Sequence, residues 1–115
     1  MLEASRILPE NDFYTSAINR AYYAVFYAAN ALLVTKGLSQ GKHSGVISSF
    51  RQHFIKTGLI ASEYSKIYGG LMEDRHESDY ELESPVDRQD TESDLSNAES
   101  FVHEIQRWLK QENWI

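Results

Sequence analysis

The sequence predicts an all-helical fold, an up-and-down bundle of about five helices in which the first is short and four are substantial. Apolar residues recur at spacings of three, four and seven in several segments, as they do along one face of an α-helix. No segment alternates apolar and polar residues with a period of two, which is the pattern of a half-buried strand. Glycine or proline stands between the segments, at Pro9, Gly37, Gly58 and Pro85.

Composition sets the first limits. The chain has 115 residues, 42% of them hydrophobic, so residues 1–115 are predicted to form a single domain around one core. There is no cysteine, which excludes disulfides and thiolate metal sites. Residues 1–70 carry seven Lys or Arg against four Asp or Glu (+3), and residues 71–115 carry four against thirteen (−9), for a total of −6. An acidic total argues against strong non-specific nucleic-acid binding, but it is compatible with a local basic surface in the first part of the chain.

The first predicted element is a short helix over residues 1–8, which Pro9 ends. Such a short segment is marginal as an independent helix, so we expect it to dock on the rest of the bundle. Its shortness also leads us to expect a truncated start of the chain.

The second helix is predicted from a cap at Asn11 or Asp12 to about Lys36, just before a glycine. Between residues 21 and 34 every residue except Asn30 is apolar, so all sides of the helix are apolar. A helix of this kind normally lies at the centre of a bundle or in an oligomer interface. Because one bundle of this size is too small to cover all of that surface, we predict a homodimer.

The same apolar run does not predict a membrane protein. It is shorter than the roughly 20 residues needed to cross a bilayer. It also has no basic leader before it and no obvious cleavage site after it, unlike a secretion signal. We therefore expect a soluble, cytoplasmic protein without a membrane partner.

Three further helices follow. They are predicted from about His43 to Lys56, from the cap residue Ser62 to about Leu82, and after an acidic stretch over residues 87–94. The fourth helix continues through two adjacent glycines, although each lowers helix stability by about 1 kcal/mol. The apolar residues at helical spacing in these three segments are Val46, Ile47, Phe50 and Phe54, then Tyr64, Ile67, Tyr68, Leu71 and Met72, then Leu95, Ala98, Phe101, Val102, Ile105, Trp108 and Leu109.

The most compact cluster of reactive side chains is RHESDY, residues 75–80. On a helix Arg75 faces Asp79 and His76 faces Tyr80, because residues four apart are neighbours. One interpretation is a solvated face with an ion pair. The functional alternative is a catalytic or phosphate-binding site of these four residues. In that site Arg75 would bind a phosphate, His76 could transfer protons near neutral pH, and Tyr80 could donate a hydrogen bond or accept a transferred group.

Other residues extend the candidate phosphate site. Lys42 and His43 stand at the start of the third helix, where backbone N–H groups favour anions, although ordinary loop polarity is the alternative. Arg20 opens an apolar helix and cannot be buried cheaply without a partner, so a structural ion pair with an acid of the fourth helix is its alternative role. The predicted phosphate- or nucleotide-binding residues are thus Arg20, Lys42, His43 and Arg75.

One motif in the sequence is also found in metal sites. Glu73 and His76 form the Glu-x-x-His pair that helical bundles use for di-iron sites, but such a site needs a second pair and two more glutamates. The second helix has no acid after Asp12 and the third has none. We therefore predict no metal site and no cofactor.

Several short motifs together resemble the HEPN domain, and in particular its small prokaryotic branch. The resemblance covers about residues 12–110 in register. The motifs are Ala17-Ile18-Asn19-Arg20-Ala21-Tyr22-Tyr23-Ala24 with Phe26, Ala31-Leu32-Leu33, Lys36-Gly37, Lys42-His43-Ser44-Gly45-Val46-Ile47 with Phe50, Thr57-Gly58, Arg75 with Asp79-Tyr80, and Ala98 with Phe101-Val102.

This resemblance implies a usually dimeric helical bundle that is often encoded beside a minimal nucleotidyltransferase as a toxin–antitoxin pair. Many HEPN proteins are metal-independent ribonucleases whose motif is arginine, a polar residue and, a few residues later, histidine, facing its counterpart across the dimer cleft. Arg75 and His76 match the start of this motif, but the distal histidine is absent and Tyr80 stands four residues after His76. In related pairs the partner enzyme transfers AMP to a tyrosine near the motif, which implies that Tyr80 is an AMP acceptor.

Three functional hypotheses follow. The first is a HEPN component of a nucleotidyltransferase-linked toxin–antitoxin pair that binds nucleotide or RNA phosphate near Arg75. The second is an active metal-independent ribonuclease toxin that uses Arg75 and His76, and the third is a helical interaction module without chemistry.

Overall fold

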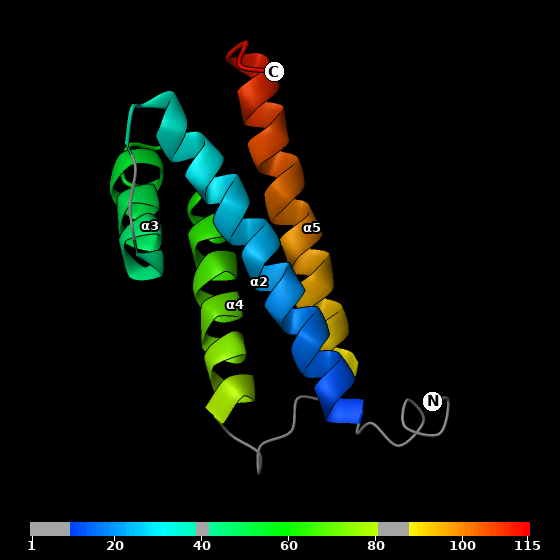
Figure 1. Cartoon of the computed structure of the whole chain (residues 1–115). Helices are drawn as coiled ribbons and strands as arrows, with labels where there is room; N and C mark the ends of the chain where they lie inside the picture. The colour runs from blue at the N-terminus through cyan, green and yellow to red at the C-terminus, as the bar shows by residue number, and fades with distance from the viewer. Residues whose placement is uncertain (1–9, 39–41, 81–87) are drawn as a thin grey trace.

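The computed structural model describes residues 10–38, 42–80 and 88–115, apart from the side chains of residues 10–13, 76–80 and 88. All regular structure within these ranges is helical, as predicted (Figure 1). The elements are α2 (Glu10–Thr35), α3 (His43–Phe50), the π-helical segment η1 (Arg51–Ile55), α4 (Ser62–Tyr80) and α5 (Arg88–Gln111). The predicted short helix over residues 1–8 lies outside the described residues.

Helix α2 is the centre of the fold. It packs against α3, α4 and α5, and Figure 1 shows it crossing between α4 and α5. Its inward face is apolar because Tyr22, Val25, Ala29 and Leu32 follow one another at helical spacing, and all four are fully buried. Aromatic rings of the other elements complete the core. Phe101 of α5 lies 5.4 Å from the Phe50 ring and 5.8 Å from the Tyr68 ring, centroid to centroid.

The directions in which the helices run correct the prediction of an up-and-down bundle. Helices α4 and α5 run up and down as expected, but α3 runs in the same direction as α2. His43, at the start of α3, lies against Phe26 in the middle of α2, and Phe54 in η1 lies under Lys36 just beyond the end of α2. A strict up-and-down order was therefore wrong for this pair. In this orientation the aromatic residues of α3 and η1, Phe50 and Phe54, are both fully buried in the core that α2 centres.

The predicted helix ends are partly confirmed. Gly37 and Gly58 adopt φ angles of +70° and +80°, the left-handed conformation that ends helices and that glycine adopts without strain. The predicted cap at Asn11 or Asp12 was wrong, since α2 already includes Glu10. The third segment is not one α-helix. The N–H of Lys56 donates to the carbonyl of Arg51, five residues back, so the chain passes from α3 into a π-turn.

The start of α5 was also predicted too late. The acidic stretch that we interpreted as a lead-in is helical from Arg88 onward. Thr91 and Asp94 are 3% and 7% exposed and lie on the face that continues into Ala98 and Phe101. Because polar residues occupy these core positions, the spacing of apolar residues does not reveal the first turns of α5. Leu95, predicted to be in the core, is 38% exposed.

One face of α2 remains uncovered in the described structure. Ala24, Tyr27, Ala31 and Val34 are exposed at spacings of three and four, with Tyr27 64% and Val34 67% exposed. Within the described residues, α2 thus carries apolar side chains that its neighbouring helices do not cover. We call these four residues the outer stripe of α2. None of the described helices is both long enough and apolar enough to cross a membrane.

Candidate functional site

The side chain of Arg75 is held by two polar groups of α2. Its Nε donates a hydrogen bond to Asn19 Oδ1 at 2.8 Å, and its Nη2 donates to the Tyr23 hydroxyl at 3.3 Å. Asn19 and Tyr23 are four residues apart, so their side chains lie one above the other on the helix. Arg75 is near the C-terminal end of α4, so these bonds join α4 to the first half of α2.

Two aromatic rings complete the setting of Arg75. Its guanidinium carbon lies 4.7 Å from the centre of the Tyr22 ring and 5.3 Å from that of Tyr23. Guanidinium groups stack favourably on aromatic faces, and the bonds described above fix the plane of the fork. Arg75 is therefore oriented in advance, which lowers the entropy lost when it binds an anion.

Tyr22 connects Arg75 to His43. The Tyr22 hydroxyl and His43 Nδ1 are 3.2 Å apart, and the His43 ring lies 4.2 Å from the Phe26 ring and 5.5 Å from the Tyr23 ring. Burial raises the pKa of Tyr22 above its ordinary value, and the positive charge of Arg75 opposes that rise only in part. The phenol thus stays neutral and can donate to an unprotonated Nδ1.

The structure brings some of the predicted phosphate ligands together and separates one. His43 and Arg75 share the Tyr22 side chain, and Lys42 directly precedes His43 as the exposed N-cap residue of α3. Arg20 does not join them. It is exposed at an open groove between α2 and α5, and it makes no ion pair among the described residues. That groove has a volume of about 630 Å³, and four of its ten lining residues are alanines.

The remaining predicted site residues lie in the last turn of α4. Their backbone is helical, so Asp79 follows Arg75 by about one turn. The side chains of His76, Asp79 and Tyr80 are outside the described residues. Their catalytic roles, and the role of Tyr80 as AMP acceptor, therefore stay predictions.

Asn19, Tyr22 and Tyr23 were missed as parts of the site. We interpreted the two tyrosines only as apolar surface. A usable signal exists in the sequence, because Asn19 and Tyr23 place polar atoms four residues apart on an otherwise apolar helix. Nothing in the spacing of α4 reveals that Arg75 is their partner, since the contact joins residues 56 positions apart.

A pair of carboxyl groups lies beside the site. Asp94 of α5 is buried, and its carboxyl group lies beside that of Asp74 of α4, the residue before Arg75. Burial, the neighbouring Asp74 carboxyl group and the negative charge of Asp90 raise the pKa of Asp94 to about 8. Two adjacent carboxylates repel each other, so the pair holds a proton at neutral pH. This pair was also missed, because Asp94 falls in the stretch interpreted as a connection.

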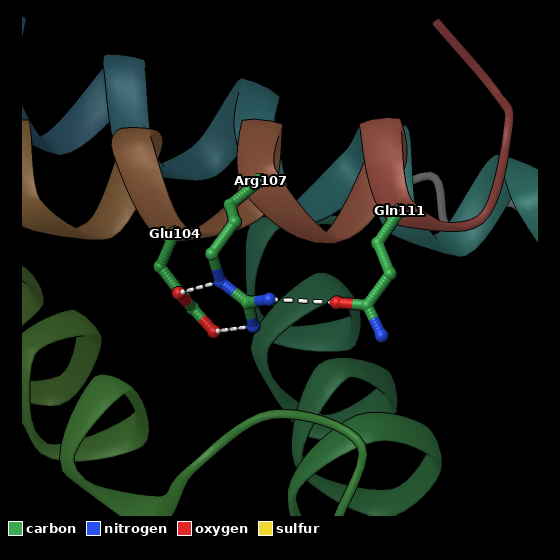
Figure 2. Close-up of polar contacts among 3 residues, drawn as sticks. All are labelled: Glu104, Arg107 and Gln111. Carbon is green, nitrogen blue, oxygen red and sulfur yellow. Dashed lines mark hydrogen bonds and ion pairs between the residues drawn. The ribbon is translucent and has the colours of Figure 1, made fainter.

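A second arginine, Arg107, lies in surroundings that differ from those of Arg75. Figure 2 shows Arg107 on the outer side of α5, where it binds both carboxylate oxygens of Glu104 at 2.7 Å and the side-chain oxygen of Gln111 at 2.7 Å. The hydrogen bonds from Arg107 lower the pKa of Glu104. An exposed pair within one helix has little effect on stability. Arg107 is useful as a comparison, because it has the charge of Arg75 without the aromatic setting.

Comparison with known sequences identifies the family. The HEPN domain profile matches residues 1–109 of the chain. The chain belongs to the HEPN family. A HEPN relationship agrees with the all-helical architecture, and no solved structure matches the chain.

Individual relatives agree with this HEPN assignment. A protein of Thermotoga maritima named "UPF0332 protein" is 37% identical over 109 residues, which are 95% of this chain and 83% of that protein. Two proteins of Methanocaldococcus jannaschii carry the name "putative toxin". One is 41% identical over 110 residues, covering 96% of this HEPN chain and 81% of its own, and the other is 33% identical over 112 residues, covering 97% and 76%.

Proposed function

We propose that this HEPN protein is the toxin-type component of a nucleotidyltransferase-linked pair and that it binds a phosphate of RNA or nucleotide at Arg75. The clamp of Arg75 by Asn19 and Tyr23 carries the proposal, because two hydrogen bonds and the rings of Tyr22 and Tyr23 orient its cationic fork. The family membership and the names of the two archaeal relatives support the toxin-type role.

The chemistry of the cluster fits a phosphate ester. A guanidinium fork matches two phosphate oxygens and stabilises the charge that develops on them during transfer or cleavage. His43 is hydrogen-bonded to the hydroxyl of Tyr22, whose ring Arg75 covers, so it adds an imidazole on the same side of α2. Imidazole titrates near neutral pH and is the usual proton carrier in such reactions.

A metal-independent ribonuclease is the second candidate, and the position of His43 favours it. The family motif places its second reactive group after the arginine on the same helix, where this chain has Tyr80. An imidazole from α3 could take the proton-transfer role instead of, or beside, that of His76. Ribonuclease activity would then use Arg75 for charge stabilisation and a histidine for proton transfer.

The homodimer belongs to the same proposal. Ala24 of the outer stripe also lines the groove between α2 and α5, so the two features adjoin. Small residues allow two helices to approach closely, and Tyr27 supplies a large apolar side chain for the contact. A second copy bound through the same surface would make a two-fold symmetric interface.

The nucleotidyltransferase partner is tested by co-expression with the product of the neighbouring gene. Affinity capture should retain the partner, and intact mass should show an added nucleotide that disappears in Tyr80→Phe. Loss of the added mass in Tyr80→Phe with capture unchanged would assign the acceptor. Capture of no partner, together with an unmodified mass, contradicts this part of the proposal.

Binding and cleavage are tested with purified protein, a set of labelled RNAs and a chelator. Arg75→Ala should abolish binding, and Arg107→Gln, which removes an arginine of α5, should not. Cleavage that persists in the chelator and is lost in Arg75→Ala and His43→Ala would establish the ribonuclease. Binding that is equal in Arg75→Ala and the parent protein would refute the site.

A further inference from the structure

Two departures from regular α-helix meet where η1 packs on α4. Arg51 opens the π-helical segment, and π-helical turns are rare and often lie at functional sites. Gly69 and Gly70 lie inside α4, where each glycine lowers helix stability by about 1 kcal/mol. Arg51 and both glycines line one open groove of about 890 Å³. Both departures thus leave their residues on the same surface.

The two glycines leave one turn of α4 without side chains. Lys66 and Glu73 are seven residues apart and line the same groove, so they lie on one side of the helix about two turns apart. Gly69 and Gly70 lie between them. A Cβ atom at Gly70 would have nothing within 4 Å, so the space above this turn is open. We call Arg51, Lys66 and the two glycines the η1–α4 site.

Arg51 extends over the edge of this turn. A Cβ atom at Gly69 would be 2.8 Å from Arg51 Nη2, so the guanidinium occupies space that a side chain at residue 69 would need. Its Nε donates a hydrogen bond to Ser65 Oγ at 2.8 Å, and its Nη2 donates to the Ser65 carbonyl oxygen at 3.5 Å. These bonds use one edge of the guanidinium. Nη1 makes no hydrogen bond to a described residue, so the other edge can bind a ligand.

Two positive charges lie together at the η1–α4 site. Ser65, which holds Arg51, directly precedes Lys66, and both cations line the groove. Both acceptors of Arg51 are neutral, so they orient the guanidinium without cancelling its charge. Arg107 differs, because its guanidinium is paired with Glu104. A guanidinium edge binds two oxygens of an oxyanion, and an adjacent ammonium group can neutralise a second negative charge.

We propose that the η1–α4 site binds a phosphate dianion, either inorganic phosphate or the phosphate of a nucleoside monophosphate. Two oxygens bind the free edge of Arg51, and a third binds Lys66 beside the open turn at Gly70. A phosphate monoester carries about −1.5 to −2 charge at pH 7, whereas a phosphodiester carries one negative charge, so two cations favour the monoester. The site goes beyond the proposed function, because it does not use Arg75, whose guanidinium is held against α2.

The site is tested by titrating the intact ¹⁵N-labelled protein with inorganic phosphate, AMP and cyclic AMP. Phosphate and AMP should shift the NMR signals of the Arg51 Nε–H and of the Gly69 and Gly70 amides saturably. Cyclic AMP is a diester and should bind several-fold more weakly. Equal affinities for phosphate and AMP would assign inorganic phosphate as the ligand, and tighter binding of AMP would assign a nucleotide.

The same spectra separate this site from the one proposed at Arg75. Shifts confined to Arg75 and its partners Asn19 and Tyr23 would overturn the η1–α4 site and support the proposed function. Saturable shifts at Arg51, Gly69 and Gly70 alone would support the η1–α4 site without the Arg75 site. No saturable shift at either place would refute both.

Charge variants test the residues that bind the anion. Arg51→Gln and Lys66→Gln should each weaken phosphate binding about tenfold, because each removes a hydrogen bond from a charged group. Glu73→Gln removes a carboxylate that lines the same groove and should tighten binding. Arg107→Gln removes an arginine from α5 and should leave the affinity unchanged. Equal losses in Arg51→Gln and Arg107→Gln would mean that only overall charge matters, which contradicts the site.

Ser65→Ala tests the orientation of Arg51 without changing any charge. It removes the acceptor of Arg51 Nε and should weaken phosphate binding several-fold, and Ser65→Thr, which keeps the hydroxyl, should bind like the parent. Ser96→Ala changes an exposed serine of α5 and is the control. Circular dichroism verifies that each variant keeps its helical content. A Ser65→Ala protein that binds phosphate as tightly as its parent would rule out a site built on an oriented Arg51.

Discussion

The buried carboxyl group of Asp94 in α5 lies beside that of Asp74 in α4, and Asp94 Oδ2 has no hydrogen-bond partner among the described residues. Arg75 is the next residue after Asp74, so the acid pair and the proposed phosphate site are built on the same turn of α4. The protonation state of this pair therefore affects the packing of α5 against α4 next to Arg75.

Stability should fall as the pH rises toward 8. The folded protein holds a proton at Asp94 with a pKa of about 8, whereas an unfolded aspartate has a value near 3.8. The folded state binds more protons between these values, so this contribution is complete below about pH 4 and is lost as pH rises through the folded pKa. The slope from one proton is at most about 1.4 kcal/mol per pH unit.

The measurement is urea unfolding at several pH values between 5 and 9. Asp94→Asn cannot ionise, so it should remove this slope and be more stable than its parent at pH 9. Glu99→Gln removes an exposed carboxyl from the same helix and should keep the slope. A parent protein and an Asp94→Asn variant with parallel pH profiles would show that the pair does not hold the proton.

The hydrogen bonds that hold Arg75 should contribute measurably to the free energy of unfolding. Asn19→Ala removes the partner of Arg75 Nε and should lower the free energy of unfolding by about 1.5–3 kcal/mol, the range for hydrogen bonds to charged groups. Tyr23→Phe removes a longer bond and should cost about 1 kcal/mol or less. Denaturant unfolding checks both values.

Two controls separate the clamp from general damage to α2. Asn30→Ala changes an asparagine of the same helix that makes no described hydrogen bond, so it should have little effect. The double variant Asn19→Ala with Arg75→Ala should cost less than the sum of the single changes, because the shared bond is lost only once. Strict additivity would argue against the bond.

The two adjacent glycines of α4 should respond differently to alanine. Gly70→Ala adds a methyl group to open space and should raise the free energy of unfolding by about 1 kcal/mol, the difference in helix propensity. Gly69→Ala gains the same helix propensity but displaces Arg51 from Ser65. The loss of that hydrogen bond should offset about 0.5–1.5 kcal/mol of the gain in the free energy of unfolding. Thermal or urea unfolding of the two variants gives the comparison, and equal stabilisation would mean that Arg51 does not lie on Gly69.

The outer stripe of α2 should control oligomeric state. Tyr27→Glu puts a charge on an exposed apolar position, so it should convert a dimer to a monomer without loss of helical content. Light scattering over a range of protein concentrations measures the mass. Lys56→Glu is the control, because it changes the charge at an exposed position away from the stripe. A parent protein that is monomeric at every concentration would contradict the dimer.

Much of the fold was accessible from the sequence because apolar spacing reports burial directly. Val46, Ile47, Phe50 and Phe54 were expected in the core, and all four are buried. The late start predicted for α5 has a clear cause. Where polar residues occupy buried positions, as at Thr91 and Asp94, the apolar pattern stops before the helix does.

The candidate site was accessible only in part. Arg75 was identified from its neighbours in the chain, but its clamp depends on residues of another helix, and spacing along α4 contains no information about them. The same holds for Arg51, whose position depends on Ser65 and on the missing side chain of Gly69. Such contacts between distant residues require the three-dimensional structure.

The π-turn at η1 sets the rotational phase of the residues on either side of it. Arg51 opens this turn and lines an open groove beside α4, and Phe54 lies in the core beside Trp108. Residues of an α-helix are 100° apart around its axis, so deleting one residue before Phe54 would rotate Phe54 relative to α3 by about that angle. A single deletion there would move Phe54 out of the core, whereas a substitution of an exposed residue in the same turn would keep its direction.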